Sequence, residues 1–422
     1  MKPGTGRRGP MTALLTRRNV RRLSAVCSAL GALVVTSATL APEAAAVDIQ
    51  SKEWYLDFMG ADDIWKISTG KGVKVAVIDS GVNPETPSLK GQVLVDEVPE
   101  SVSYHVTHDK AGHGTSMAEI IAGTGAGGGI KGLAPDAKII PFRVDGGELV
   151  GDEIGRTPTV RDAIRAAADS NAKIINMSFG AGDTADGADA AVKYAVSKGK
   201  LLFASVGNDG DKGNLPSYPA NYPGVIGVSA LDKTGTVAKF STFGNYVDLS
   251  APGLHVPSWC DGTFTEYCDT DGTSPASAIA SASAALIWSA HPDWTANQVL
   301  RSLVDTAARD WPKDTPSRYL GYGGVRPRRV LINKDIDPGP PDVDPLAAQN
   351  GTLSASPGPS AKTPSGRPTT GAGSANGPTS AAAAKDTDSG SGTQTWVIIG
   401  AVAAVLVIGG AGFAVLRARR NA

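Results

Sequence analysis

The chain has 422 residues, of which 41% are hydrophobic, so it is long enough for one or two folded domains. Its 40 lysines and arginines nearly balance its 41 aspartates and glutamates, which argues against a nucleic-acid partner and against a generally acidic ligand. The basic residues gather at two places, one near each end of the chain.

The N-terminal segment has the three parts of a secretory signal peptide. A basic region comes first, with Arg17, Arg18, Arg21 and Arg22. The apolar run LSAVCSALGALVVTSATLA follows, and Ala44 and Ala46 then fit a small-residue cleavage site. We therefore predict a signal peptide over residues 1–46. An uncleaved membrane anchor is the alternative, and it is disfavoured because serine and threonine interrupt the short apolar run.

Short apolar runs alternate with amphipathic runs from about residue 52 to 335. The apolar runs predict buried strands over 73–78, 137–144, 172–178, 200–206 and 224–230. The amphipathic runs predict helices over 159–170, 187–199 and 297–308. This alternation indicates one α/β domain, assigned to residues 47–335, with a parallel sheet covered by helices on both faces. Sites in such sheets lie at the carboxyl ends of the strands.

Asp79 and His113 stand where a side chain would reach such a site. Asp79 follows the predicted strand VKVAVI and precedes Ser-Gly, so its carboxylate emerges where a buried strand turns. His113 lies between two glycines in GHGTSMAEIIAG, and these glycines allow close backbone approach around an exposed imidazole. Taken singly, a turn aspartate and a structural or solvent-facing histidine are the more ordinary interpretations.

Asn208 and Ser274 each allow two interpretations. Asn208 follows a predicted strand and a glycine in SVGN, so it is either a turn residue or an amide that donates to an anion. Ser274 lies in DTDGTSPASA, where it is either a helix N-cap followed by a favoured proline or a nucleophile. The two roles of Ser274 are compatible, because a serine at a helix start has an exposed hydroxyl and an unpaired N–H.

Two cysteines remain once Cys27 leaves with the signal peptide. Seven residues separate Cys260 from Cys268, and in an oxidising compartment this spacing predicts a disulfide that closes a small loop. We expect this disulfide to order the approach to Ser274. Free thiols or a metal pair are the alternatives, and no cluster of histidine and cysteine supports a metal. We predict no cofactor, and structural calcium sites are left unassigned.

The composition of the C-terminal part, from residue 336 onward, does not predict a folded core. Residues 336–394 are rich in Pro, Gly, Ser, Thr and Ala and predict an unfolded linker. Residues 395–416 contain the uncharged run WVIIGAVAAVLVIGGAGFAVL, which as a helix would be about 31 Å long and would span a bilayer. The basic tail, 417–422, then lies in the cytoplasm and the α/β domain outside the cell. A buried core helix is disfavoured, because no globular sequence follows it.

Together the four candidate residues supply the parts of a site that hydrolyses amides. Such a site needs a hydroxyl nucleophile, a histidine that takes and returns its proton, a carboxylate that orients the histidine, and donors for an oxyanion. Ser274, His113, Asp79 and Asn208 supply these groups in turn. The order Asp, His, Ser along the chain is that of subtilisin.

The sequence resembles the subtilisin-like serine proteases in three motifs: VAVIDSGVN, GHGTSMAEIIAG and DGTSPASA. The resemblance covers about residues 52–335 and implies a doubly wound α/β domain. It also implies a triad of Asp79, His113 and Ser274, with Asn208 and the Ser274 N–H as the oxyanion hole. It further implies two sets of substrate contacts. The strand that pairs with the peptide consists of Ser178, Phe179 and Gly180. One wall of the primary specificity pocket consists of Ala204, Ser205, Val206 and Gly207.

The whole layout, from signal peptide to basic tail, resembles the mycosins, the membrane-anchored proteases of type VII secretion systems. This resemblance implies a protease in the cell membrane that cleaves a protein or peptide beside a secretion complex. A scaffold of that complex whose proteolysis is dispensable is the alternative. An α/β-hydrolase esterase is disfavoured, because the chain lacks G-x-S-x-G and has a different order of residues.

The sequence departs from the subtilase pattern in two respects. About 30 residues separate Val47 from Asp79, which is too few for the large prodomain usual in the family. Pro275 directly follows Ser274, and Ala278 stands where the family usually has a proline. Pro275 has no N–H, but the backbone donor of the implied oxyanion hole belongs to Ser274 itself.

Overall fold

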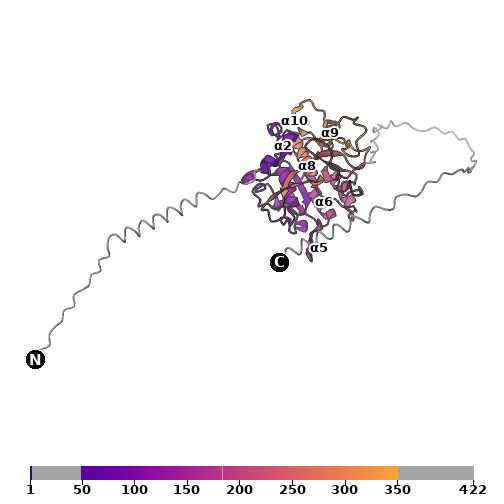
Figure 1. Cartoon of the computed structure of the whole chain (residues 1–422). Helices are drawn as coiled ribbons and strands as arrows, with labels where there is room; N and C mark the ends of the chain where they lie inside the picture. The colour runs from indigo at the N-terminus through magenta and orange to yellow at the C-terminus, as the bar shows by residue number, and fades with distance from the viewer. Residues whose placement is uncertain (2–48, 183, 350–422) are drawn as a thin grey trace, which may run out of the picture. The chain divides into compact units, whose positions relative to one another are not determined.

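The computed structural model describes Met1, residues 49–182 and residues 184–349 (Figure 1). Apart from Met1, the predicted signal peptide lies outside these residues, as do the predicted transmembrane helix, the basic tail and the linker beyond residue 349. Within the described ranges, no helix combines the length and the apolarity needed to cross a membrane.

A parallel sheet of six strands forms the centre of the domain. Its strands are β1 (Lys74–Asp79), β2 (Lys138–Arg143), β3 (Ile174–Met177), β4 (Leu201–Ser205), β5 (Val225–Leu231) and β6 (Leu249–Pro252). They lie in the order β2-β1-β3-β4-β5-β6, and every neighbouring pair is parallel. The order therefore changes direction between β1 and β3. In open α/β sheets the crevice at such a point, outside the carboxyl ends of the strands, is where ligands bind.

The two faces of the sheet face two separate apolar cores. In β1, Val75 and Val77 belong to one core, and Ala76 and Ile78 belong to the other. This alternation follows from the two-residue period of side chains along a strand. Both faces are buried, which explains why the strands read as nearly continuous apolar runs.

Helices cover both faces of the sheet. On the larger core lie α4 (His113–Ala122), α8 (Thr273–Ala290), α9 (Ala296–Thr306) and α10 (Pro327–Ile332). On the smaller core lie α6 (Val160–Asp169) and α7 (Ala188–Ser197). The doubly covered parallel sheet predicted from the sequence is thus confirmed.

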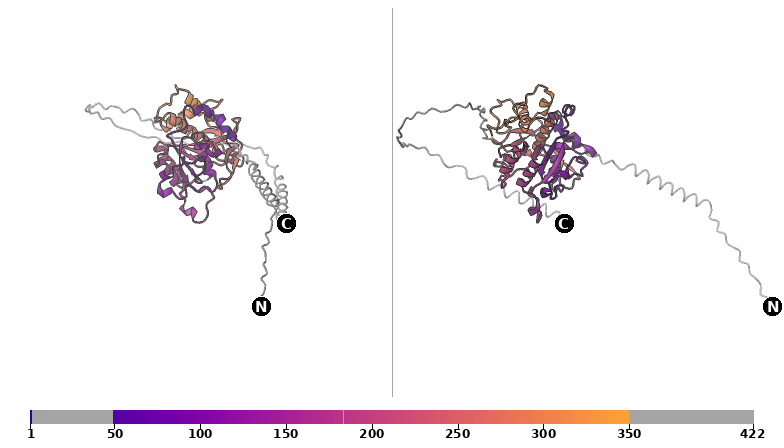
Figure 2. Two further views of the ribbon diagram at one scale, coloured as in Figure 1. Left: turned by 90° about the vertical axis from the view of Figure 1, so that its left-hand side faces the viewer. Right: turned by 180° about the vertical axis from the view of Figure 1, so that it is seen from behind.

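Short elements complete the described part. They are η1 (Ile49–Lys52), α2 (Trp54–Met59), α3 (Ala61–Ile64), η2 (Val95–Glu97), η3 (Glu100–Val102), η4 (Ala126–Gly128) and α5 (Glu153–Arg156). The indigo N-terminal helices lie beside the orange C-terminal ones in Figures 1 and 2, and Arg328 of α10 pairs with Asp63 of α3 at 2.8 Å. The N-terminal and C-terminal segments of the domain are therefore in direct contact.

The five predicted strands and three predicted helices are confirmed, each with ends within two residues of those observed. The sequence did not predict β6 or the antiparallel hairpin of β7 (Val256–Trp259) and β8 (Tyr267–Thr270). Each of these strands has four residues, and β8 is partly exposed, so none contains a buried apolar run long enough to stand out.

The folded region extends further than the predicted boundary at residue 335. Leu346 is buried, the Thr295 hydroxyl donates to the Pro341 carbonyl at 2.9 Å, and Gln349 Nε2 donates to Asp248 Oδ1 at 2.7 Å. Residues 336–349, which the composition assigned to the linker, thus pack on the domain. The predicted boundary was too early because these contacts come from backbone carbonyls and a few side chains, which leave little trace in composition.

Candidate active site

His113 and Asp79 meet at the carboxyl edge of the sheet. Asp79 is the last residue of β1, and His113 is the first residue of α4. Asp79 Oδ1 accepts a hydrogen bond from His113 Nδ1 at 2.7 Å. The aspartate is 3% exposed and the histidine side chain 36% exposed, so the carboxylate is buried while the other edge of the imidazole remains accessible.

The glycines on both sides of His113 permit this close contact. A Cβ at Gly114 would lie 2.2 Å from the Gly81 carbonyl oxygen and 2.9 Å from Asp79 Cβ. Gly112 has a φ of 75°, and a Cβ there would lie 2.6 Å from the Asp261 carbonyl oxygen. The close backbone approach expected from the sequence is confirmed, and each contact requires glycine.

Asp109, which sequence analysis did not single out, fixes the start of α4. Its Oδ1 accepts from the N–H of Gly112 at 2.9 Å, and its Oδ2 accepts from the N–H of Thr115 at 2.8 Å. Asp109 Oδ1 also accepts from the Ser80 hydroxyl at 2.8 Å, and that hydroxyl in turn accepts from the N–H of Gly114 at 3.0 Å. The backbone N–H groups around His113 are therefore paired by side chains outside the helix.

The charges around His113 favour its protonated form. Burial alone lowers the pKa of the imidazole, but the adjacent Asp79 carboxylate, with smaller effects from Asp109 and Glu148, raises it to about 9. The carboxylate also fixes the proton on Nδ1 when the ring is neutral, which leaves Nε2 as the basic nitrogen.

Ser274 is the second residue of α8, and the helix begins after Gly272 as N-cap. The N-cap position that the sequence allowed for Ser274 is therefore wrong by two residues. Pro275 still lies in the first turn, where its missing N–H removes no bond of the helix. The Ser274 hydroxyl donates to the Ser178 carbonyl at 2.7 Å, and the Ser178 hydroxyl donates to the Ser274 carbonyl at 3.0 Å.

Asn208 lies beside Ser274, after the carboxyl end of β4. Its Oδ1 accepts from the backbone N–H and from the hydroxyl of Thr273, both at 3.0 Å. A backbone N–H can only donate, so these bonds fix which amide atom is oxygen. Nδ2 makes no hydrogen bond within the described residues, which leaves it available as a donor.

A buried polar network ties α8 to β3. Asn176 Oδ1 accepts from the hydroxyls of Ser277 and Ser281, both at 3.0 Å, and Asn176 Nδ2 donates to Ser178 Oγ at 2.9 Å. Sequence analysis missed Asn176. The signal was a lone amide within the apolar run AKIINMS, since a buried amide needs partners.

Asp79, His113, Asn208 and Ser274 line one cleft of about 590 Å³. Of the predicted substrate contacts, Ser178, Phe179, Gly180, Ser205 and Gly207 line the cleft. Ala204 and Val206 do not, because their side chains are buried in the smaller core, on the opposite side of the strand. The structure therefore does not bring these two side chains into the cleft.

Four cleft residues that the sequence analysis missed come after β2: Val144, Asp145, Gly146 and Glu148. They lie at or just beyond the carboxyl end of a predicted strand, so the rule that pointed to Asp79 applies to them as well. Burial raises the pKa of the Glu148 carboxyl, and Asp109 adds to this effect. This side of the cleft is acidic.

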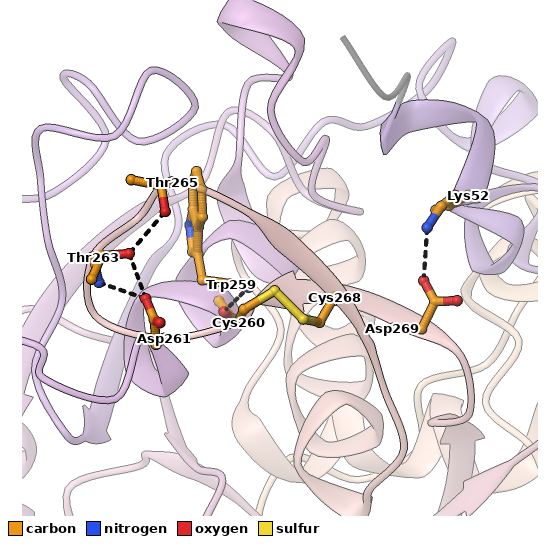
Figure 3. Close-up of a disulfide and its surroundings, with 9 residues drawn as sticks. Lys52, Trp259, Cys260, Asp261, Thr263, Thr265, Cys268 and Asp269 are labelled. Atoms are coloured by element: carbon orange, nitrogen blue, oxygen red, sulfur yellow. Dashed lines mark hydrogen bonds and ion pairs between the residues drawn. A yellow bond between two sulfur atoms is a disulfide. The ribbon is translucent and has the colours of Figure 1, made fainter. Parts of the chain in front are cut away.

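The predicted disulfide is present. Cys260 and Cys268 are bonded, with their Cα atoms 5.0 Å apart, and the bond joins the ends of β7 and β8 (Figure 3). Within the described ranges, no group of three or more His, Cys, Asp or Glu residues could hold a metal ion.

Comparison with known proteins identifies the family. Residues 70–323 match the sequence model of the subtilase family. The chain belongs to the subtilase family. This subtilase is 34% identical over 284 residues to the thermostable alkaline protease of Halalkalibacterium halodurans, over 67% of this chain and 74% of that protein. It is 36% identical over 242 residues to subtilisin E of Bacillus subtilis, over 57% of this chain and 61% of subtilisin E. The chain thus spans less than two thirds of that subtilisin.

Solved structures give a more specific likeness. The MycP3 protease from the type VII (ESX-3) secretion system superposes with a TM-score of 0.53 at 29% identity, over 66% of this subtilase and 88% of MycP3. MycP1, a serine protease described as an essential component of the type VII (ESX-1) secretion system, superposes with a TM-score of 0.55 at 29% identity, over 68% and 90% of the two chains. The resemblance to mycosins seen in the sequence is confirmed.

Proposed function

We propose that this subtilase is a membrane-anchored, extracytoplasmic serine endopeptidase with Asp79, His113 and Ser274 as its triad. The observation that carries the proposal is that these three residues and Asn208, widely separated in the sequence, line one cleft at the carboxyl edge of the sheet. Chance does not readily bring together a buried carboxylate, an accessible imidazole, a hydroxyl at a helix start and an unpaired amide donor.

The first step forms an acyl-enzyme. In the described structure the Ser274 hydroxyl donates to the Ser178 carbonyl, so it must rotate toward His113 Nε2 before reaction. Ser274 Oγ then attacks the scissile carbonyl carbon while its proton passes to Nε2. The oxyanion accepts hydrogen bonds from Asn208 Nδ2 and from the Ser274 N–H. Cleavage of the C–N bond transfers the proton from Nε2 to the departing amine.

The second step releases the acyl group. A water molecule attacks the acyl carbonyl carbon and gives a proton to His113 Nε2, and the returning Ser274 Oγ recovers this proton as the ester breaks. Asp79 keeps its charge throughout and stabilises the imidazolium that forms twice in the cycle. The hydrogen bond of 2.7 Å from His113 Nδ1 supports this role.

The substrate is an extended peptide. The backbone N–H and C=O groups of Phe179 and Gly180 make no hydrogen bonds within the described residues. At the next residue, the Ala181 N–H donates to the Tyr218 carbonyl, and the Ala181 carbonyl accepts from the Tyr218 N–H. An edge of this kind can bind a strand through its backbone. A Cβ at Gly180 would lie 1.9 Å from the Ser217 hydroxyl oxygen, so a side chain there would require this hydroxyl to move.

The cellular setting is part of the proposal. The predicted signal peptide and the apolar run at 395–416 support a single-pass membrane protein with its protease domain outside the cell. The likeness to MycP1 and MycP3 supports association with a type VII secretion system.

A serine-directed fluorophosphonate tests the proposed chemistry. The full-length chain should be labelled at Ser274, and Ser274→Ala should abolish the labelling. Ser289→Ala is the matched control, since Ser289 lies at the far end of the same helix and its hydroxyl donates to the Lys71 carbonyl. Labelling that persists in Ser274→Ala, or a folded parent chain that is never labelled, would overturn the proposal.

A scaffold whose proteolysis is dispensable is the second candidate, because MycP1 is described as an essential component of its secretion system. Secretion in cells that carry Ser274→Ala distinguishes the two. Normal secretion in Ser274→Ala cells, together with lost secretion in cells lacking the chain, would make scaffolding the essential role.

A further inference from the structure

The hairpin of β7 and β8 contacts the backbone beside His113 and precedes Ser274 along the chain. Its strands pair in antiparallel register from Val256 with Thr270 to Trp259 with Tyr267, and the Cys260–Cys268 disulfide closes the loop beyond them (Figure 3). Both cysteines are exposed to solvent, so a reductant can reach the bond.

The loop at the end of this hairpin packs directly against the backbone just before His113. A Cβ at Gly262 would lie 2.3 Å from the Lys110 carbonyl oxygen and 2.6 Å from the Asp109 carbonyl oxygen. From the other side, a Cβ at Gly112 would lie 2.6 Å from the Asp261 carbonyl oxygen. Two backbone segments are therefore in direct contact through paired glycines, which is tighter than packing through side chains.

A hydroxyl links the hairpin to the first turn of α4. The Trp259 N–H donates to Ser116 Oγ at 2.9 Å, and the Ser116 hydroxyl donates to the Gly112 carbonyl at 2.6 Å. The second strand adds a contact further along the helix, where the Tyr267 hydroxyl donates to Glu119 Oε2 at 3.2 Å.

The other end of the hairpin leads into the nucleophile. Thr270 ends β8, and two residues later the Gly272 N–H donates to the Gly253 carbonyl at 2.8 Å. Ser274 follows in the first turn of α8. One hairpin thus contacts the backbone before His113 and continues into the backbone before Ser274.

We propose that the disulfide-closed hairpin is a positioning element that fixes His113 relative to Ser274. It acts through the Trp259–Ser116–Gly112 hydrogen bonds and the glycine contacts, and touches neither substrate nor reacting atoms. The sequence expectation that the disulfide orders the approach to Ser274 is thereby extended to the histidine. This inference rests on the proposed protease function.

Loss of the hairpin contacts should change the rate more than the affinity. A misplacement of about 1 Å at a reacting group costs up to about 100-fold in rate, so we expect kcat to fall about 10- to 100-fold with KM little changed. The acid limb of the pH profile should also move to lower pH. The ionisable groups that face His113 are Asp79, Asp109 and Glu148, and a loosened helix start weakens all three interactions, which together raise the pKa of His113.

Reduction of the disulfide is the first test. The full-length parent chain and Cys260→Ser/Cys268→Ser are assayed with a peptide substrate, with and without dithiothreitol, while circular dichroism records the fold. We expect dithiothreitol to lower kcat of the parent to that of the variant, to leave the variant unchanged, and to leave both folded. Reoxidation should restore the parent. The third cysteine, Cys27, is the same in both chains and cancels in the comparison.

A pair of serine variants gives an independent test. Ser116→Ala removes the link from Trp259 and a hydroxyl bond to the carbonyl four residues earlier. Ser283→Ala removes the same kind of bond, to the Ile279 carbonyl at 2.8 Å, at an equally buried position of α8, and within the described residues the Ser283 hydroxyl makes no hydrogen bond to the hairpin. We expect only Ser116→Ala to lower kcat and shift the acid limb.

Three results would overturn the positioning role. The first is an unchanged kcat in the reduced parent, and the second is an equal effect of the two serine variants. The third is activity that falls only in proportion to the loss of the circular dichroism signal. A parent chain that neither cleaves peptides nor reacts with the fluorophosphonate would instead contradict the protease function itself. The two failures are therefore distinguishable.

Discussion

The bond between Asp79 and His113 predicts how the stability of the domain depends on pH. Burial lowers the pKa of His113, but the Asp79 carboxylate more than offsets this effect, so the pKa rises from 6.5 to about 9. A histidine whose pKa is raised by folding stabilises the folded state fully below pH 6.5, and this contribution is lost as the pH rises through about 9. Asp79→Asn removes the negative charge and should remove this pH dependence.

The size of the effect follows from the shift and from the exposure of the imidazole. A rise of the His113 pKa from 6.5 to about 9 corresponds to about 3.4 kcal/mol of favourable interaction free energy between the imidazolium and its surroundings. Since 36% of the His113 side chain is exposed, water screens the interaction, and we expect about 1–2 kcal/mol in practice.

Unfolding in urea at a series of pH values measures this contribution. Two full-length chains are compared, both with Ser274→Ala to prevent self-cleavage, and one with Asp79→Asn in addition. Between pH 6.5 and about 9, the chain with Asp79 should lose about 1–2 kcal/mol more unfolding free energy than the Asp79→Asn chain. Buried Glu53 and Glu119 also have raised pKa values, but they are the same in both chains and cancel in the difference.

Equal loss of stability in the two chains over this pH range would refute the reasoning. It would mean that the Asp79 carboxylate does not hold the proton on His113, and the proposed orientation of the imidazole would lose its main physical support.

Three further predictions concern other parts of the domain. Asn208→Asp keeps an acceptor for Thr273 but removes the Nδ2 donor, so kcat for a peptide should fall at least about 100-fold while the melting temperature is retained. Cys260→Ser/Cys268→Ser should lower the unfolding free energy in urea by about 2.5 kcal/mol, the loop-entropy value for so short a loop. Burial raises the pKa of Glu53 from 4.5 to about 8, so Glu53 should make the parent lose stability as the pH rises between these values, and Glu53→Gln should reduce that loss.

The fold was predictable where burial leaves a pattern in the sequence. β1 to β5 are buried on both faces, so each reads as an apolar run bounded by turn residues. β6, with the sequence LSAP, and the partly exposed YCDT of β8 contain no such run. They form because β6 pairs with β5 and β8 pairs with β7, and these partners are visible only in three dimensions.

The site was predictable where chemistry and chain position coincide. Asp79, Asn208 and Ser274 each lie at the end of a strand or the start of a helix, where side chains are exposed at the sheet edge. Asn176 was missed because its partners Ser277 and Ser281 lie about a hundred residues further along the chain. No local pattern indicates that such distant hydroxyls will meet.

The starts of α4 and α8 explain why the side chains of His113 and Ser274 remain available. A helix N-cap usually pairs the first N–H groups with its own side chain, but the N-caps of α4 and α8 are Gly112 and Gly272, which have none. Asp109 supplies the acceptor for α4, and Asn208 Oδ1 supplies it for α8.

This arrangement separates capping from chemistry. Because capping comes from residues outside both helices, the side chains in the first turns, His113 and Ser274, are not occupied with it. In the proposed mechanism Asn208 serves two purposes with one amide: its oxygen accepts hydrogen bonds from Thr273 at the helix start, and its nitrogen donates to the oxyanion. In that mechanism one side chain fixes both the start of the helix that carries Ser274 and the position of the negative charge that forms when Ser274 attacks.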